Sequence, residues 1–152
     1  MAVDAYILQR GEGRSIDLGG FTMTVKAAGP EADGTFCFLE ADEPAGFGPP
    51  LHIHHDAAEA FYVVDGEYII FLPDGETLCP AGSFIFIPPG VEHGFRVGQV
   101  QSRKLNLYVP AAMIGYFDEI AAAAGGLDKD GLVKLAAKYS MEVTGPVPRG
   151  YI

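Results

Sequence analysis

Up to about Pro110, the chain is made of short segments in which apolar and polar residues alternate, separated by Gly, Pro and Asp. Alternation with a period of two is typical of β-strands with one buried face, and these segments are rich in aromatic and β-branched residues. None is long and periodic enough for the helix of a parallel crossover, so an all-β antiparallel sandwich or closed barrel is expected. The predicted strands are Tyr6–Gln9, Phe21–Ala27, Thr35–Glu40, Leu51–His54, Glu59–Val64, Glu67–Leu72, Ser83–Ile87, His93–Val97 and Val100–Val109.

One turn in this region has a distinctive sequence. Asp65-Gly66 lies between two strand-like runs, Phe-Tyr-Val-Val and Glu-Tyr-Ile-Ile. An Asp-Gly pair between such runs is typical of a tight β-hairpin. We therefore predict that the strands before and after this turn pair with each other.

The apolar pattern changes to helical spacing after Pro110. Two groups of residues have this spacing: Met113, Ile114, Phe117, Ile120 and Ala121, and then Leu132, Leu135, Ala136 and Tyr139. We predict two short helices, the second capped by Asp128 or Asp130. The chain should thus comprise a β-barrel in residues 1–110 and a helical C-terminal extension in residues 111–152, packed on the barrel as one structural domain. The helices are expected to cover one mouth or edge of the barrel; the alternatives are a lid over a site and part of a dimer contact.

Composition narrows the possible partners. The chain has 152 residues, 49% of them hydrophobic, which fits one folded domain. Its net charge of −10 argues against nucleic acids and anionic membrane surfaces, because both require basic patches. No apolar run has the length of a membrane span, and the first residues do not resemble a secretion signal. Cys37 and Cys79 lie in strand-like segments and are interpreted as buried thiols of a reducing compartment, so a cytoplasmic protein is expected.

A cluster of histidines predicts a metal site. Three of the four histidines fall within residues 52–55, and His52 and His54 share one face of their predicted strand because they are two residues apart. Glu59 begins the next strand and His93 begins a later one. If the sheet closes, these three imidazoles and one carboxylate can converge on one divalent transition metal (Fe, Mn, Ni, Co, Cu or Zn). Burying the two strand histidines without such partners would cost about 1–3 kcal/mol each.

The same alternation predicts which neighbours face away from this site. His55 and Glu92 are each an odd number of residues from a predicted ligand, and we place both outside the ligand set. Basic residues on the barrel are few: Lys26, Arg96, Arg103 and Lys104. A phosphate clamp requires inward-facing Arg or Lys, and Arg96 should point outward. This argues against phosphosugar substrates.

Two motifs resemble the signatures of the cupin superfamily. The first is Gly46-x5-His52-x-His54-x4-Glu59-x6-Gly66, and the second is Gly82-x5-Pro88-x-Gly90-x2-His93. The second departs from the family pattern at its end, where Val97 replaces the usual Asn. Together the motifs cover about a third of the chain. The resemblance implies a jelly-roll β-barrel with a metal held by His52, His54, Glu59 and His93.

Within that superfamily, the segment from Pro49 to Val63 and the two trailing helices are similar to small single-domain cupins related to quercetin 2,3-dioxygenase. This similarity implies that Phe61 and Phe95 flank the substrate, since their positions match residues that do so in such cupins. Each lies two residues after a predicted ligand and should share its face. Related cupins are commonly dimers, and the apolar segment Tyr6–Leu8 could pair across a two-fold axis, so a homodimer is expected.

The function predicted from these residues is that of a metal-dependent dioxygenase. An apolar, aromatic cavity suits a small apolar or aromatic substrate such as an enol, a phenol or a flavonol-like molecule. Glu59 is the one predicted ligand able to accept a proton, so it is the candidate catalytic base of this quercetinase-like oxidoreductase. Two alternatives remain open. One is a non-redox cupin enzyme, a polyketide cyclase or isomerase with zinc as Lewis acid; the other is a small-molecule-binding cupin without catalysis.

Overall fold

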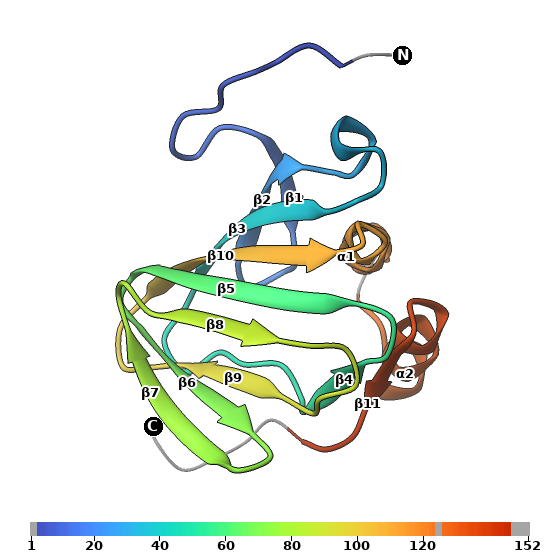
Figure 1. Cartoon of the computed structure of the whole chain (residues 1–152). Coiled ribbons are helices and arrows are strands. Elements are labelled where there is room, and N and C mark those ends of the chain that lie inside the picture. The colour runs from blue at the N-terminus through green and yellow to red at the C-terminus, as the bar shows by residue number, and fades with distance from the viewer. Residues whose placement is uncertain (1–2, 124–125, 147–152) are drawn as a thin grey trace.

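The computed structural model describes residues 3–123 and 126–146, and Figure 1 shows its elements. In chain order they are β1 (Arg14–Asp17), β2 (Thr22–Ala27), a short 3-10 helix (Pro30–Ala32), β3 (Cys37–Glu43), β4 (His52–His54), β5 (Ala58–Asp65), β6 (Glu67–Leu72), β7 (Gly75–Pro80), β8 (Phe84–Ile87), β9 (Gly94–Val97), β10 (Ser102–Val109), α1 (Met113–Ala122), α2 (Lys129–Lys138) and β11 (Met141–Val143). This is the mostly β chain with two short C-terminal helices that the sequence predicts.

The strands form a jelly-roll β-barrel, and every strand pair is antiparallel as expected. The larger sheet has the order β1-β2-β3-β10-β5-β8, the smaller one has the order β7-β6-β9, and β4 pairs with β11 in a third. Strands that are distant in the sequence, such as β3 and β10, are therefore direct neighbours. In Figure 1 the helices lie at one end of the strands.

Alternation along the strands divides the interior into two apolar clusters. One cluster lies between the larger sheet and the C-terminal helices and includes Met23, Leu39 and Met113. The other lies where β5 and β8 pack against β6 and β9, and it includes Phe61 and Phe95. Burying side chains of this size contributes about 1.5–3 kcal/mol each to folding. The candidate site lies between these two clusters.

The C-terminal segment returns to the barrel after its helices. Asp128 caps α2, because its side chain accepts a hydrogen bond from the backbone N–H of Gly131 at 2.7 Å. After α2, Ser140 has a positive φ of 55° and the chain continues into β11. This strand pairs with β4, the strand that carries two of the histidines. The sequence interpretation did not identify β11.

The hairpin predicted at Asp65-Gly66 is wrong. β5 pairs with β10 and β8, whereas β6 pairs with β7 and β9, so the turn connects two different sheets. Ser102 explains the change of sheet, because its hydroxyl accepts a hydrogen bond from Glu67 N at 2.9 Å and donates one to Glu67 O at 3.1 Å. Gly66 has a φ of 76°, and a Cβ there would lie 2.1 Å from Ser102 Oγ, so only glycine fits.

The strand predicted at Tyr6–Gln9 is also wrong. These residues form an exposed arm, in which the Tyr6 hydroxyl donates to the backbone oxygen of Lys26 at 2.7 Å. Besides β11, two further strands were missed, β1 and β7. Most of their residues are exposed, so the alternation between apolar and polar positions is weak in both. Among the helices of the described residues, none has the length and hydropathy required to cross a membrane.

Candidate metal centre and its cavity

The strand β4 directs two histidines into the barrel. His52 and His54 are buried, while Ile53 between them is only half-buried, as the period of two predicts. β11 pairs with β4 on one side. On the other side His52 and His93 form an isolated β-bridge, in which the N–H of each donates to the carbonyl oxygen of the other at 3.0 and 2.9 Å. Backbone pairing thus brings His93 beside β4.

Glu59, the second residue of β5, completes the group. Its Oε2 atom lies 2.9 Å from His93 Nε2 and 3.1 Å from His54 Nε2. The ring of His52 lies 4.4 Å from that of His93 and 4.9 Å from that of His54, measured between centroids. One nitrogen or oxygen atom from each of these four buried side chains lies within 4.8 Å of the others. The structure therefore brings together all four residues that the sequence analysis placed in one ligand set.

Backbone carbonyls orient two of the imidazoles. His52 Nδ1 lies 2.8 Å from Pro50 O, and His93 Nδ1 lies 2.9 Å from Val91 O. A carbonyl oxygen only accepts, so each Nδ1 carries the proton and each Nε2 is left with its lone pair. Such a second bond to a ligating histidine is typical of metal sites, where it sets the tautomer and the ring direction.

Burial and neighbouring charge both act on the protonation of this group. Burial lowers the pKa of His52 to about 4, and the nearby imidazole of His93 lowers it further. Burial raises the pKa of Glu59, but its close contacts with the His54 and His93 imidazoles outweigh burial and hold that pKa well below its usual range. A neutral imidazole and an ionised carboxylate are the forms that bind a metal ion.

The residues present fit a divalent metal. Both ring nitrogens of His54 are buried and make no hydrogen bond within the described residues, which is costly unless a ligand satisfies one of them. A carboxylate facing imidazole lone pairs also requires a proton or a cation between them. Three nitrogens and one oxygen suit the borderline ions from Mn²⁺ to Zn²⁺.

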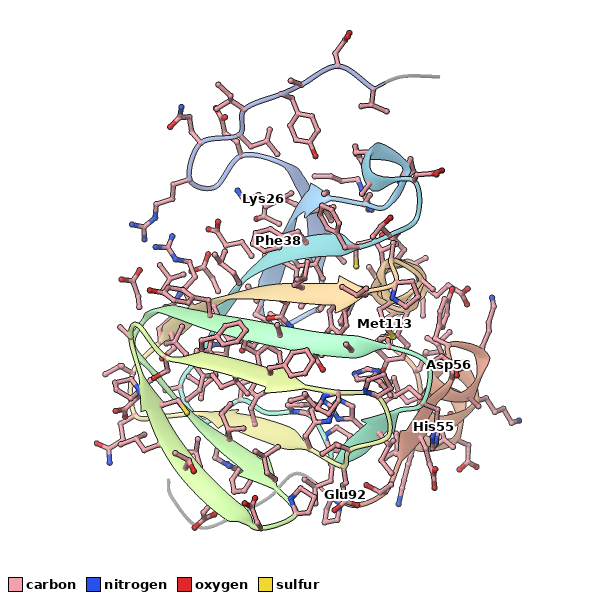
Figure 2. All side chains as sticks on the ribbon, viewed as in Figure 1. Lys26, Phe38, His55, Asp56, Glu92 and Met113 are labelled. Atoms are coloured by element: carbon pink, nitrogen blue, oxygen red, sulfur yellow. The ribbon has the colours of Figure 1, made fainter. Side chains whose placement is uncertain are left out.

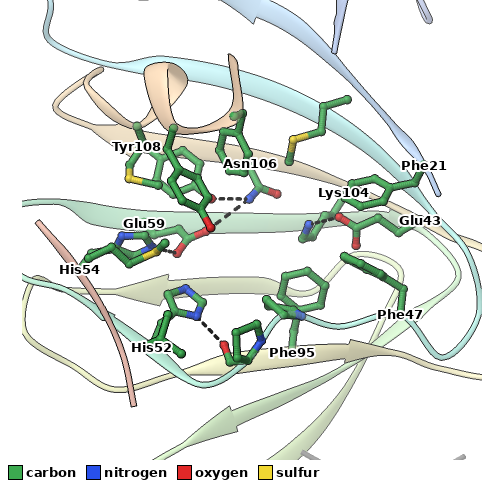
Figure 3. A pocket seen from close by; sticks show the side chains of 18 residues that line it. Phe21, Glu43, Phe47, His52, His54, Glu59, Phe95, Lys104, Asn106 and Tyr108 are labelled. Atoms are coloured by element: carbon green, nitrogen blue, oxygen red, sulfur yellow. Dashed lines mark hydrogen bonds and ion pairs between the residues drawn. The ribbon is translucent and has the colours of Figure 1, made fainter. Parts of the chain in front are cut away.

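The four residues open onto a cavity of about 110 Å³. Its wall is mostly apolar and includes Phe21, Met23, Phe47, Pro49, Pro50, Phe95, Met113, Tyr116, Phe117, Met141 and Val143. Residues of α1 and β11 therefore form part of the wall, in addition to covering one end of the barrel. Figure 3 shows Phe95 between the histidine end and the far end of the cavity.

The two phenylalanines predicted to flank a substrate have different positions. Phe95 lines the cavity. Phe61 lies deeper, 2% exposed, with its ring centroid 5.9 Å from that of Phe95, and it is not among the residues of the cavity wall. Phe61 therefore supports Phe95 from behind, and substrate contact stays a prediction for both.

His55 and Glu92 lie outside the ligand set, in agreement with the alternation argument. The His55 side chain is exposed, and its Nε2 lies 2.9 Å from Glu142 Oε2 on β11. Glu92 is half-buried and is not one of the clustered ligand residues. Both are labelled in Figure 2 near the surface of the molecule.

Four polar residues of the cavity were missed by the sequence interpretation. These are Glu43, Lys104, Asn106 and Tyr108, and all four are buried. The last three alternate along β10, so the period of two in that segment was a signal that they share a face. Lys104 is therefore a basic side chain that faces the cavity, whereas the sequence interpretation considered the direction of Arg96 alone.

Asn106 connects the metal group to β10. Its Nδ2 donates to Glu59 Oε1 at 3.3 Å and to the Tyr108 hydroxyl at 3.2 Å, as Figure 3 shows. These bonds hold the Glu59 oxygen that faces away from the histidines. Asn106 is thus a positioning residue for that carboxylate.

Replacing Asn106 with Ala should weaken metal binding by about 10- to 100-fold, the usual effect of losing a hydrogen bond to a ligating carboxylate. A chelator-competition titration measures this affinity. Leu107→Ala, on the opposite face of the same strand, is the control and should retain wild-type affinity. Equal affinities in the two variants would exclude the positioning role.

A family profile described as "Cupin domain" matches residues 38–101. The quercetin 2,3-dioxygenase of Bacillus subtilis (strain 168) is 25% identical over 112 residues, which are 74% of this chain but 33% of that protein. The chain thus spans about a third of the length of this curated relative.

Three solved structures share the fold. KdgF from Halomonas sp. has a TM-score of 0.62 at 18% identity, covering 70% of this chain and 94% of that one. The polyketide cyclase RemF from Streptomyces resistomycificus has a TM-score of 0.61 at 22% identity, covering 71% and 80%. An RmlC-like cupin from Shewanella frigidimarina NCIMB 400 has a TM-score of 0.59 at 19% identity, covering 73% and 96%. At these identities the likeness is one of fold.

Proposed function

The chain belongs to the cupin superfamily, and from this premise we propose that it is a metal-dependent dioxygenase that cleaves a small enol, phenol or flavonol-like substrate. The observation that carries the proposal is the buried group of His52, His54, Glu59 and His93 at the end of an apolar, aromatic cavity. The similarity to a quercetin 2,3-dioxygenase supports the same reaction class.

The cavity favours an aromatic substrate over a sugar phosphate. Its wall is mainly aromatic and aliphatic, and its one lysine is already paired with a carboxylate. Phosphate recognition requires cationic donors without such a partner. A flat apolar molecule can instead contact Phe95 and the side chains from α1 and β11.

In the proposed reaction, Glu59 accepts the proton of the substrate hydroxyl and so binds an enolate or phenolate. Asn106 holds Glu59 Oε1, and the opposite oxygen remains directed at the histidines. A metal ion held by these residues would lower the pKa of the substrate hydroxyl and support reaction with O2. Both atoms of O2 enter the product as one carbon–carbon bond breaks, so no external reductant is needed. The apolar wall excludes water from the reacting anion.

A non-redox enzyme is the second candidate. Three histidines and a glutamate also suit zinc, which acts as a Lewis acid in isomerisation or cyclisation, and the polyketide cyclase RemF shares the fold. The same pocket without turnover would make the protein a small-molecule-binding cupin. Both alternatives predict that the purified protein consumes no oxygen.

We also propose a cytoplasmic homodimer. The N-terminal arm exposes Tyr6, Ile7 and Leu8, and Ile7 is 84% exposed, which leaves apolar surface for a second copy. Small-angle scattering at working concentration measures the assembly. A mass equal to that of one chain would contradict the dimer.

The function is tested by elemental analysis of the purified protein, followed by oxygen uptake with a panel of flavonols and 1,3-diketones. We expect close to one divalent transition metal per chain and oxygen consumption that depends on both metal and substrate. A zinc-only protein without oxygen uptake favours the cyclase or isomerase. If the protein binds none of the candidate ions, both the dioxygenase and the metal-dependent cyclase or isomerase are excluded.

A further inference from the structure

A buried ion pair lies in the cavity wall, away from the metal group. Lys104 Nζ donates to Glu43 Oε1 at 2.6 Å, and both side chains are 1% exposed. The two residues are 61 positions apart in the sequence and meet because β3 and β10 are neighbours. Figure 3 shows the pair at one end of the cavity and the histidines at the other.

Aromatic rings hold the ammonium group in place. Lys104 Nζ lies 4.3 Å from the ring centroid of Phe95, 5.3 Å from that of Phe61 and 5.4 Å from that of Tyr68. These distances allow cation–π attraction and fix the position of the charge. The Lys104 side chain therefore points toward a defined place in the cavity.

The pair is incompletely satisfied within the described residues. Glu43 Oε2 is buried with the Tyr68 hydroxyl as its neighbour but makes no hydrogen bond of good geometry there, and Glu43 Oε1 is the one acceptor that Lys104 Nζ contacts. An ammonium group has three donors, so two of them remain for other acceptors. A buried carboxylate oxygen without a partner is costly. The geometry thus offers one acceptor and further donors side by side.

The strand register sets the distance between this pair and the metal group. Lys104 is opposite Val63 in the pairing with β5, and Tyr108 is opposite Glu59. Lys104 and Tyr108 are four residues apart, roughly 13 Å along an extended strand. A ligand that reaches both places has two polar ends and an apolar body of one or two rings.

We propose that Glu43 and Lys104 form a second subsite that recognises a neutral hydroxyl group at the end of the substrate remote from the metal group. The hydroxyl donates its proton to Glu43 Oε2 and accepts a hydrogen bond from Lys104 Nζ. This inference rests on the proposed function, because it assumes that the other end of the substrate lies at the metal group. The substrate class becomes a hydroxylated aromatic with an ionisable enol or phenol at its opposite end.

Charge explains why a hydroxyl is favoured over a carboxylate. The ammonium and carboxylate of the pair cancel, so the far end of the cavity has no net charge to offer an anion. A ligand carboxylate would face the unpartnered oxygen of Glu43, and two like charges in a buried site repel strongly. A hydroxyl satisfies both neighbours at once. A ligand with only a hydrogen at this position leaves them unpaired.

The test measures binding of three probes that differ at one end: naphthalene-2,6-diol, 2-naphthol and 6-hydroxy-2-naphthoate. Each retains one naphthol hydroxyl for the metal group. Zinc-loaded protein is used, so that binding is measured without oxidation. The chain has no tryptophan, so naphthol fluorescence can be titrated directly, and calorimetry checks the values.

The cavity variant is Glu43→Leu with Lys104→Met, which removes both charges together and leaves neither alone in the interior. The control is Lys26→Met with Glu40→Gln, a second pair on neighbouring strands at 3.4 Å that does not line the cavity. Glutamine at the control position keeps an acceptor for Arg103. Lys26 is labelled in Figure 2, and it is not one of the residues that line the cavity. Melting curves and zinc content establish that both variants fold.

We expect wild-type protein and the control to bind the diol about 10- to 100-fold more tightly than 2-naphthol, the usual effect of a hydrogen bond to a charged group. The naphthoate should bind more weakly than the diol. In the cavity variant the preference for the diol should fall below about threefold. Equal binding of diol and 2-naphthol by wild type, a preference that persists in the cavity variant, or no binding of any probe would each overturn the subsite.

A single variant keeps the proposal testable if the double variant does not fold. Glu43→Gln retains the shape of the side chain and removes its charge, so the unpaired Lys104 should now bind the naphthoate more tightly than the diol. An unchanged order of affinities would overturn the proposal. Failure of the proposed function is separate, because it appears as absence of bound metal or of oxygen uptake. If the protein shows no oxygen uptake but still prefers the diol through Glu43 and Lys104, the proposed function fails and the subsite is supported.

Discussion

Replacing Glu59 with Gln is expected to lower turnover by about two to four orders of magnitude while much of the metal stays bound. A positioned general base contributes that much to a proton-transfer step. Glutamine retains the shape of the side chain and one oxygen atom that can bind a metal, but it cannot accept the substrate proton. Oxygen uptake and elemental analysis of the same preparation separate the two effects.

Glu92→Gln is the matched control, because Glu92 is next to His93 but outside the clustered ligand residues. It should retain wild-type turnover and metal content. If Glu59→Gln remains as active as this control, Glu59 is not the base. If Glu59→Gln instead loses its metal completely, its role is that of a ligand and the proton acceptor must be sought elsewhere.

Replacing His54 with Ala should remove the metal and lower the melting temperature together. A metal present at about 100 times its Kd stabilises the folded state by about 2.7 kcal/mol. For a chain of this length that corresponds to about 5–10 °C. His54 makes no hydrogen bond through its ring within the described residues, so the stability lost should come mainly from the metal. Elemental analysis and thermal melts measure both quantities.

The control for this variant is His55→Ala, directly after the strand, where the side chain is exposed and paired with Glu142. It should keep both the metal and the melting temperature within about 2 °C of wild type. A second control repeats both melts in excess chelator, where the gap between wild type and His54→Ala should shrink. A gap of the same size with and without chelator would mean that His54 stabilises the fold without a metal.

The candidate metal centre shows how far local pattern can reach. His52 and His54 face the interior because they are two residues apart on one strand, and the same rule excludes His55 and Glu92. Glu59 and His93 follow from motif spacing. The facing of each side chain needs only the chain direction and the strand period, which are local properties of the sequence, whereas the meeting of Glu59 and His93 with β4 also depends on closure of the barrel.

The corner at Asp65-Gly66 shows where local pattern fails. The dipeptide has the composition of a hairpin turn, yet β5 and β6 belong to different sheets. The change of sheet depends on Ser102, which lies 35 positions from Glu67 in the sequence and forms hydrogen bonds with its backbone. The residues that surround the turn in the sequence do not include Ser102, so local sequence cannot predict the change of sheet. The missed strand β11 has the same cause, because its partner β4 lies far away in the sequence.

Residue type and spacing were thus enough to identify an antiparallel β fold, the two C-terminal helices and, with the resemblance to cupin motifs, the four side chains that meet at one point. The residues at the far end of the cavity come together only when the barrel closes. Lys104 and Glu43 become partners only when β10 pairs with β3, and the wall from α1 and β11 exists only once the chain returns to β4. Strand period determines which face a side chain takes, whereas long-range pairing determines what lies opposite it, and substrate recognition depends on the second.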